Sequence, residues 1–242
     1  MRLLPGLLFL LSAWAQEPQE LSHFSEVIGA QRVYRVYLPT HYAQSERQRF
    51  PAIYWIHGFE SSEIRNAHSK AFADYVAAHN VIVVDFGPAE TTGQFPLYVP
   101  ELVEHIDLTV RTLPGREHRA VSGYSIGGYL AHWTAAKFPD LVSSASDVDG
   151  VNEAPLGPAG FNVECNLDDL RASSDGVASL RAATGVTAAL DFHMRAFETA
   201  AKTPRTFSHA DPYPNFSIWG WEAASNRRQP GYTLLEDRKS VV

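Results

Sequence analysis

The stretch Arg119-Ala-Val-Ser-Gly-Tyr-Ser125-Ile-Gly-Gly128 decides the fold that we expect for this chain. A strand is expected over residues 119–123, and helical spacing follows over residues 126–137. Between them stands G-x-S-x-G, a motif that places a serine on a sharp strand-to-helix turn. Side chains at positions 123 and 127 would collide with that turn, and the helix N-terminus favours a developing oxyanion. We therefore predict that Ser125 is a nucleophile.

Further strands and helices alternate around this turn. Strands are expected at residues 32–38, 50–56, 81–86 and 141–146, and helices at residues 67–79, 98–113 and 187–197. The segments 50–56 and 81–86 are almost continuously apolar, which is typical of strands buried on both faces. This order predicts an α/β fold with a mostly parallel sheet and helices on both faces.

The composition is that of one globular domain without a nucleic-acid footprint. The chain has 242 residues, of which 45% are hydrophobic, and a net charge of -7 with no basic run. Nucleic acid is therefore a poor partner. Cys165 is the only cysteine, which excludes an internal disulfide and any CxxC metal or redox site. The sequence leaves the oligomeric state open.

The first fifteen residues have the make-up of a secretory signal peptide. Arg2 precedes an apolar run over residues 3–11 and an A-x-A site that ends at Ala15. The run is shorter than the roughly 20 residues of a membrane span, and no later stretch predicts one. We expect a secreted or periplasmic protein with a signal peptide at residues 1–15.

A second motif, His57-Gly58-Phe59, directly follows the buried strand that ends at Ile56. A bend there can turn free backbone N–H groups toward an oxyanion. Phe59 and Ile126, the residue after the nucleophile, are the expected donors. We interpret His57 as a residue that shapes this loop rather than as the catalytic base.

Residues 30–150 resemble the esterase D-like branch of the α/β-hydrolases, which includes S-formylglutathione hydrolases, feruloyl and acetyl-xylan esterases and secreted mycolyltransferases. The resemblance rests on RVYRVYLPTHY at 32–42, FPAIYWIHGFESSE at 50–63, VIVVDF at 81–86 and HRAVSGYSIGGYLAHWTAAKFPDLVSSAS at 118–146. It implies Ser125 as the nucleophile, the N–H groups of Phe59 and Ile126 as oxyanion donors, and neither a metal nor a cofactor. The substrate class that it implies is a small-molecule or polysaccharide-linked ester.

Beyond residue 150 the family pattern fades. The family places an acid after a later strand and a His in the loop before the last helix. Residues 187–197 look like that helix, yet the loop over residues 180–185 contains no His, and no long Val/Ile-rich strand precedes it. We expect the seventh strand of the family to be shortened or missing, which leaves the fold incomplete on its C-terminal side. A deletion, a truncated gene and a degenerate copy all fit this pattern.

Three histidines follow Ser125, namely His132, His193 and His209. His132 and His193 lie on predicted helices among apolar neighbours, where a packing role is expected. His209 lies in a Pro-rich loop, and catalytic residues often occur in loops. We therefore predict His209 as the base.

Asp149 is the predicted acid of the site. It ends the strand that follows the nucleophile helix, at the active edge of the sheet. Asp191 and Asp211 are its rivals, and all three residue positions also suit a loop or cap role.

The chain divides into the signal peptide, an α/β-hydrolase domain over residues 16–205 and an aromatic-rich tail over residues 206–242. The tail predicts a hairpin with strands at 216–221 and 232–236. Its aromatic side chains would either line a sugar or aryl subsite or pack on the domain.

The sequence thus predicts a secreted serine esterase that hydrolyses carboxylic esters through an acyl-enzyme on Ser125. The alternative is a catalytically incomplete hydrolase-like binding domain that lacks the triad His. The two differ in whether a His and an acid converge on Ser125.

Overall fold

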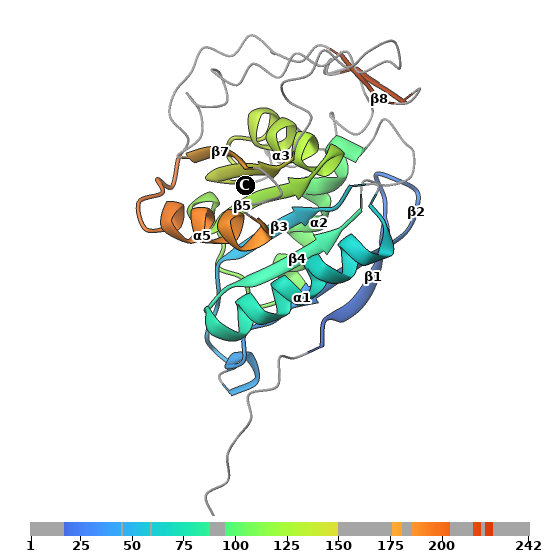
Figure 1. The fold of residues 1–242 in the computed structure, drawn as a ribbon. Coiled ribbons are helices and arrows are strands. Elements are labelled where there is room, and N and C mark those ends of the chain that lie inside the picture. The colour runs from blue at the N-terminus through green and yellow to red at the C-terminus, as the bar shows by residue number, and fades with distance from the viewer. Residues whose placement is uncertain are drawn as a thin grey trace, which may run out of the picture.

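The computed structural model describes residues 17–44, 46–58, 60–87, 95–149, 176–180, 185–203, 215–218 and 221–224. These residues form a seven-stranded sheet and a two-stranded sheet (Figure 1). The strands are β1 (Gln19–Ser25), β2 (Ala30–Tyr37), β3 (Ala52–Ile56), β4 (Ile82–Phe86), β5 (Arg119–Tyr124), β6 (Ser144–Val148), β7 (Gly176–Leu180), β8 (Asn215–Ile218) and β9 (Trp221–Ala224). The described helices are α1 (Ser62–Ala78), α2 (Phe95–Thr109), α3 (Ile126–Lys137) and α5 (Gly185–Phe197), with short 3-10 turns at η1 (Tyr42–Gln44) and η2 (Arg116–His118).

The large sheet is mostly parallel, as the sequence predicts. Its strand order is β1-β2-β4-β3-β5-β6-β7. The pairs β1–β2 and β2–β4 are antiparallel, whereas β4, β3, β5, β6 and β7 all run parallel to one another. The carboxyl ends of these five strands therefore meet at one edge of the sheet, which is where α/β folds place their sites.

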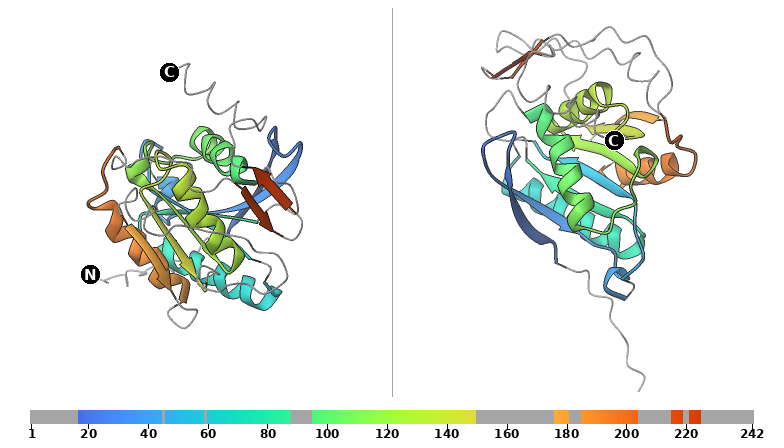
Figure 2. Two further views of the ribbon diagram at one scale, coloured as in Figure 1. Left: turned by 90° about the horizontal axis from the view of Figure 1, so that it is seen from above. Right: turned by 180° about the vertical axis from the view of Figure 1, so that it is seen from behind.

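Helices cover both faces of this sheet. Helices α1 and α5 lie on one face, and α2 and α3 lie on the other (Figures 1 and 2). The central strands β3 and β4 are buried along their whole length. Nearly continuous apolar sequence is what burial on both faces requires.

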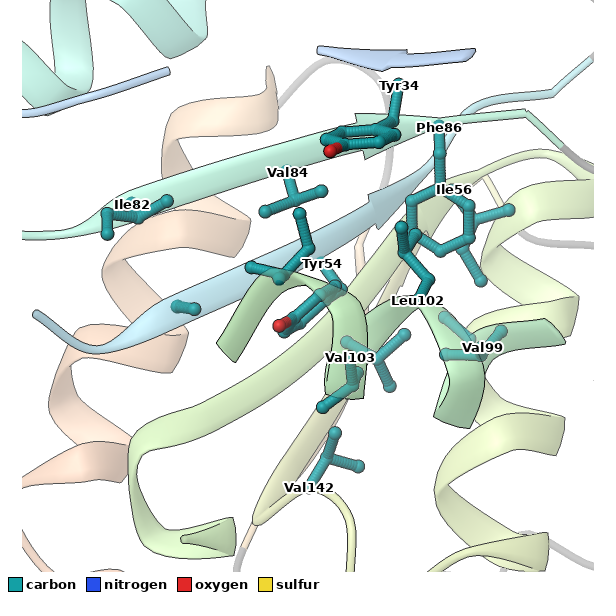
Figure 3. Close-up of a cluster of buried hydrophobic side chains, with 14 of the residues drawn as sticks. Tyr34, Tyr54, Ile56, Ile82, Val84, Phe86, Val99, Leu102, Val103 and Val142 are labelled. Atoms are coloured by element: carbon teal, nitrogen blue, oxygen red, sulfur yellow. The ribbon is translucent and has the colours of Figure 1, made fainter. Parts of the chain in front are cut away.

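One part of the core lies between the sheet and helices α2 and α3. Tyr54 and Ile56 of β3 share a buried cluster with Val99, Leu102 and Val103 of α2 (Figure 3). Burial of each such apolar side chain is worth about 1.5–3 kcal/mol. This packing holds β3, and with it the loop that follows β3, at a fixed place on the sheet edge.

Strand β1 is an addition to the predicted elements. Its sequence, Gln-Glu-Leu-Ser-His-Phe-Ser, is mostly polar, and most of its residues are exposed. The strand forms because it pairs with β2 along all seven residues. The formation of β1 therefore depends on its pairing with β2 rather than on an apolar pattern of its own.

Several predicted boundaries are shifted in the structure, and helix α2, for example, covers Phe95–Thr109 rather than 98–113. β6 covers Ser144–Val148 rather than 141–146, and Val142 instead enters the core ahead of the strand. Helix α1 begins at Ser62, five residues before the predicted start, because Ser61 caps it and accepts a hydrogen bond from the Ile64 N–H at 3.3 Å.

The seventh strand of the sheet is present. β7 has five residues, as β3, β4 and β6 do, and pairs in parallel with β6, so the expectation that this strand is missing is wrong. The sequence does not show this strand as a Val/Ile-rich run, because Gly, Ala and Ser occupy most of its positions.

The tail hairpin also differs from its prediction. β8 pairs in antiparallel fashion with β9, so the second strand lies at Trp221–Ala224 rather than at 232–236. Residues 232–236 and the predicted signal peptide lie outside the described residues. In the part of the chain that the structure describes, no helix is long and apolar enough to cross a bilayer.

Candidate active site

Ser125 adopts the strained backbone that a sharp strand-to-helix turn requires. Its φ is 54° and its ψ is -122°, and it is the N-cap residue of α3. A non-glycine residue with positive φ is uncommon, and such strain costs on the order of 1–3 kcal/mol. The Ser125 N–H donates to Val148 O at 3.0 Å, which ties the turn to the end of β6. The half-buried serine thus stands at the carboxyl edge of the parallel strands.

The glycines around Ser125 leave room for the backbone of β3. A Cβ at Gly127 would lie 1.8 Å from Ile56 O, and a Cβ at Gly123 would lie 2.5 Å from the same oxygen. Both separations are far below van der Waals contact. The predicted collision with the turn is confirmed for Gly123, whose Cβ would also lie 2.4 Å from Gly127 O, whereas a Cβ at Gly127 would collide with β3 instead.

The loop that follows β3 packs directly on this turn. A Cβ at Gly58 would lie 3.1 Å from Ser125 Cβ and 2.8 Å from Tyr124 O. Ile126 is buried and opens α3, so its N–H belongs to the first helical turn, whose N–H groups have no partner within the helix. The structure therefore brings the Ile126 N–H next to Ser125, whereas Phe59 lies outside the described residues.

His57 lies beside the end of β4. Its backbone N–H donates to Phe86 O at 3.1 Å, and a Cβ at Gly87 would lie 2.9 Å from His57 Nε2. Its Nδ1 is 3.1 Å from Arg65 Nη2. Burial lowers the pKa of His57, so the ring is neutral near pH 7. These are the contacts of a residue that shapes the loop.

A cavity of about 290 Å³ opens next to His57, at the ends of β2 and β4. Its lining includes Arg35, Arg65 and the buried Asp85. Burial, and after it the nearby Glu60 carboxylate, raises the pKa of Asp85 to about 7. The cavity is therefore lined by a carboxyl group that is partly protonated at neutral pH and by cationic side chains.

Asp149, the predicted acid, directly follows β6 on the same edge of the sheet as Ser125. It is exposed, has a φ of 48°, and its N–H donates to Leu180 O at 2.8 Å. Its neighbour Val148 accepts the Ser125 hydrogen bond, which fixes the two residues to adjacent strand ends. The rival Asp191 instead accepts a hydrogen bond from Tyr75 Oη at 2.7 Å, between α1 and α5.

The other candidates for the base are buried or fall outside the structure. His132 is fully buried, with Nε2 3.5 Å from Asp147 Oδ2, and His193 is fully buried on the face of α5 that packs on the sheet. His209 and Asp211 lie outside the described residues. Among the residues that the structure does describe, no histidine hydrogen-bonds to Ser125 Oγ.

His193 sits in a buried hydrogen-bond network on the sheet face that α5 covers. Its Nδ1 is 2.8 Å from Ser144 Oγ, and its Nε2 is 2.8 Å from Ser146 Oγ. Ser146 Oγ is in turn 2.8 Å from Ser122 Oγ. Burial lowers the pKa of His193 to about 3, so the ring is neutral and structural.

Helix α1 and the loop before it bring together two residues that sequence reasoning missed. His68 Nδ1 is 3.1 Å from Glu60 Oε2, and Glu60 is the residue after Phe59. The one signal in the sequence is an acidic residue directly after His-Gly-Phe, which is too common to single out.

A comparison with protein families covers the elbow and the loop after β3. Residues 25–182 match the model of an esterase family described as "Putative esterase". The chain belongs to this esterase family, and the resemblance seen in its sequence is confirmed.

The chain is similar to solved structures of esterases and a related hydrolase. A ferulic acid esterase is 23% identical, with a TM-score of 0.51, and the match covers 59% of this chain and 61% of that one. An S-formylglutathione hydrolase from Staphylococcus aureus is 18% identical, with coverages of 57% and 59% and a TM-score of 0.47. A ferulic acid esterase from Anaeromyces mucronatus is 19% identical, with coverages of 61% and 61% and a TM-score of 0.48. The chain therefore spans about three fifths of the length of these proteins.

Proposed function

We propose that the protein is an exported serine esterase that hydrolyses carboxylic esters through an acyl-enzyme on Ser125. The observation that carries the proposal is the backbone of Ser125, with its positive φ at the start of α3 and the Gly58 loop packed on it. Strain of this kind persists only where the surroundings enforce it, and it clusters at functional sites. Membership of the esterase family supports the same class of reaction.

In the proposed reaction His209 takes the proton from Ser125 Oγ, and this oxygen attacks the carbonyl carbon of the ester. The N–H groups of Ile126 and Phe59 stabilise the negative charge that forms on the carbonyl oxygen. The alcohol then leaves with the proton from His209, and water releases the acid and frees the serine. Asp149 orients the imidazole and stabilises its positive charge.

A catalytically incomplete hydrolase-like binding domain is the second candidate. One observation favours it: within the described ranges, no histidine side chain meets the Ser125 hydroxyl. A serine elbow without a base would retain its shape and its oxyanion donors but would turn over slowly. The reactivity of a His209 variant separates the two candidates.

Hydrolysis of p-nitrophenyl acetate by the purified protein, without added metal, tests the esterase proposal. The wild type should be active, and Ser125→Ala should lower kcat by at least about 10³-fold. His209→Ala should cost about as much, because triad members act as a unit. His41→Ala, at an exposed histidine, is the control and should leave kcat unchanged. A wild type no faster than Ser125→Ala would contradict the esterase and favour the binding domain.

Export is tested by recovering the protein from the medium or periplasm of an expressing cell. Because the A-x-A site ends at Ala15, the proposal expects Gln16 as the first residue of the mature chain. Recovery from the cytoplasm only, with Met1 or Arg2 at the start, would contradict export.

A further inference from the structure

The chain between β3 and α1 contacts α1 at two residues, His57 and Glu60. His57 Nδ1 lies 3.1 Å from Arg65 Nη2. Glu60 Oε2 lies 3.1 Å from His68 Nδ1. Arg65 and His68 are three residues apart on α1, so they project from the same face of the helix, one turn apart. Two side chains of α1 thus contact the loop that immediately precedes the helix.

Glu60 is buried to a degree that a loop carboxylate rarely reaches. Its side chain is only 1% exposed, and that of His68 is 13% exposed. Taking a carboxylate out of water is costly unless a partner offsets the loss. The contact with His68 is close but out of line for a hydrogen bond, so the attraction is that of an imidazole held against a carboxylate.

His68 also contacts the other half of the site. Its ring centroid lies 5.1 Å from that of Tyr124, in an edge-to-face arrangement. Tyr124 directly precedes Ser125. A second edge-to-face contact, at 5.6 Å, joins His68 to Trp55 of β3. One imidazole therefore touches the end of the oxyanion loop, the strand before this loop and the residue before the nucleophile.

We propose that Glu60 and His68 are positioning residues, which hold the loop at Gly58 and Glu60 in register with Ser125. This inference rests on the proposed function, because it concerns the predicted oxyanion donor at Phe59. Such a donor is effective only within about 2.7–3.1 Å of the oxyanion, and a misplacement of about 1 Å can cost on the order of 10²-fold in rate. The pair acts on the transition state and leaves the binding of the uncharged ester unchanged.

The test compares Glu60→Gln, His68→Leu and His68→Gln with Asp74→Asn. Leucine keeps an apolar side chain against Tyr124 but removes the polar ring atoms that face Glu60, whereas glutamine puts a polar side chain back beside Glu60. Asp74→Asn is the matched control, since it removes an exposed ion pair with Lys70 on the same helix. The measurements are kcat and KM for p-nitrophenyl acetate, the inhibition constant of a trifluoromethyl ketone that mimics the tetrahedral intermediate, and the Tm.

Glu60→Gln and His68→Leu should lower kcat by about 10- to 100-fold and should leave KM within about threefold of the wild-type value. The inhibition constant of the ketone should rise by the same factor as kcat falls. His68→Gln should recover most of kcat. Asp74→Asn should change neither kcat nor the inhibition constant of the ketone. Unchanged kcat in Glu60→Gln and His68→Leu, or a loss that follows Tm but leaves ketone binding intact, would overturn the inference. If His68→Leu does not fold, the comparison of Glu60→Gln with the wild type decides.

The two proposals fail in different ways. If the wild type hydrolyses the ester and Ser125→Ala does not, the proposed function stands, and the Glu60 and His68 variants alone decide the positioning role. If the wild type is no faster than Ser125→Ala, there is no oxyanion to stabilise, and the positioning role is overturned together with the esterase.

Discussion

Gly127 and Ile56 approach so closely that a Cβ on Gly127 would lie 1.8 Å from the Ile56 carbonyl oxygen. Both groups are backbone, so neither can rotate away. The contact joins the nucleophile turn to the strand that leads into the oxyanion loop, and it makes the geometry of one half of the site depend on the other.

Gly127→Ala should therefore abolish esterase activity and lower the free energy of unfolding by more than about 3 kcal/mol. Gly29→Ala is the control, because Gly29 has a φ of +72° and nothing within 4 Å of its Cβ position. It should cost only about 1–2 kcal/mol of conformational strain. Urea unfolding measures both variants, and equal losses would show that the close contact does not matter.

Replacement of Ser125 by glycine should stabilise the protein. The backbone at φ 54° and ψ -122° is strained for any side chain and open to glycine. We expect the free energy of unfolding of Ser125→Gly to be about 1 kcal/mol higher than that of Ser125→Ala. Both variants should be inactive. If the glycine variant is the less stable of the two, the turn is not strained as described.

His193 should make the protein less stable in acid. Its pKa is lowered by burial from 6.5 to about 3, so below pH 6.5 the unfolded chain binds a proton that the folded chain does not. The stabilisation is complete above pH 6.5 and is lost progressively as the pH falls. Between pH 7.5 and pH 5 the wild type should lose about 2 kcal/mol more than His193→Gln, as urea unfolding at both pH values would show. Parallel losses would contradict the buried neutral ring.

Asp85 should have the opposite effect, with stability falling as the pH rises. Its pKa is raised from 3.8 to about 7, first by burial and then by Glu60, so the folded chain holds a proton that the unfolded chain releases. Wild type should lose up to about 4 kcal/mol relative to Asp85→Asn between pH 4 and pH 8. A difference that does not change with pH would show that Asp85 is ionised throughout.

The parts of the fold that could be predicted from the sequence carry their signal locally. The elbow is set by Gly123, Ser125 and Gly127 within five residues, and β3 and β4 by unbroken apolar runs. β1 and β7 depend on the strand beside them, because neither has an apolar pattern of its own. β2 follows β1 closely along the chain, whereas β6 lies far from β7, and neither pairing follows from the residues of β1 or β7 alone.

The same distinction applies to the site. Ser125 and its donor Ile126 follow from one motif. Glu60 and His68 meet only because α1 folds back on the loop before it, and Asp85 acquires its raised pKa from burial in the assembled sheet. The base and the acid lie far from Ser125 in the sequence and can meet it only through the tertiary fold, so His209 and Asp149 stay predictions.

The central claim is that Ser125 is an activated nucleophile, and covalent labelling tests it most directly. The purified protein is incubated with a fluorophosphonate probe, digested and analysed by mass spectrometry, with Ser125→Ala and heat-denatured wild type as controls. The account predicts one modified peptide, carrying the phosphonate on Ser125, that is absent from both controls. Equal labelling of the wild type and Ser125→Ala, or no labelling of the folded protein at all, would contradict it.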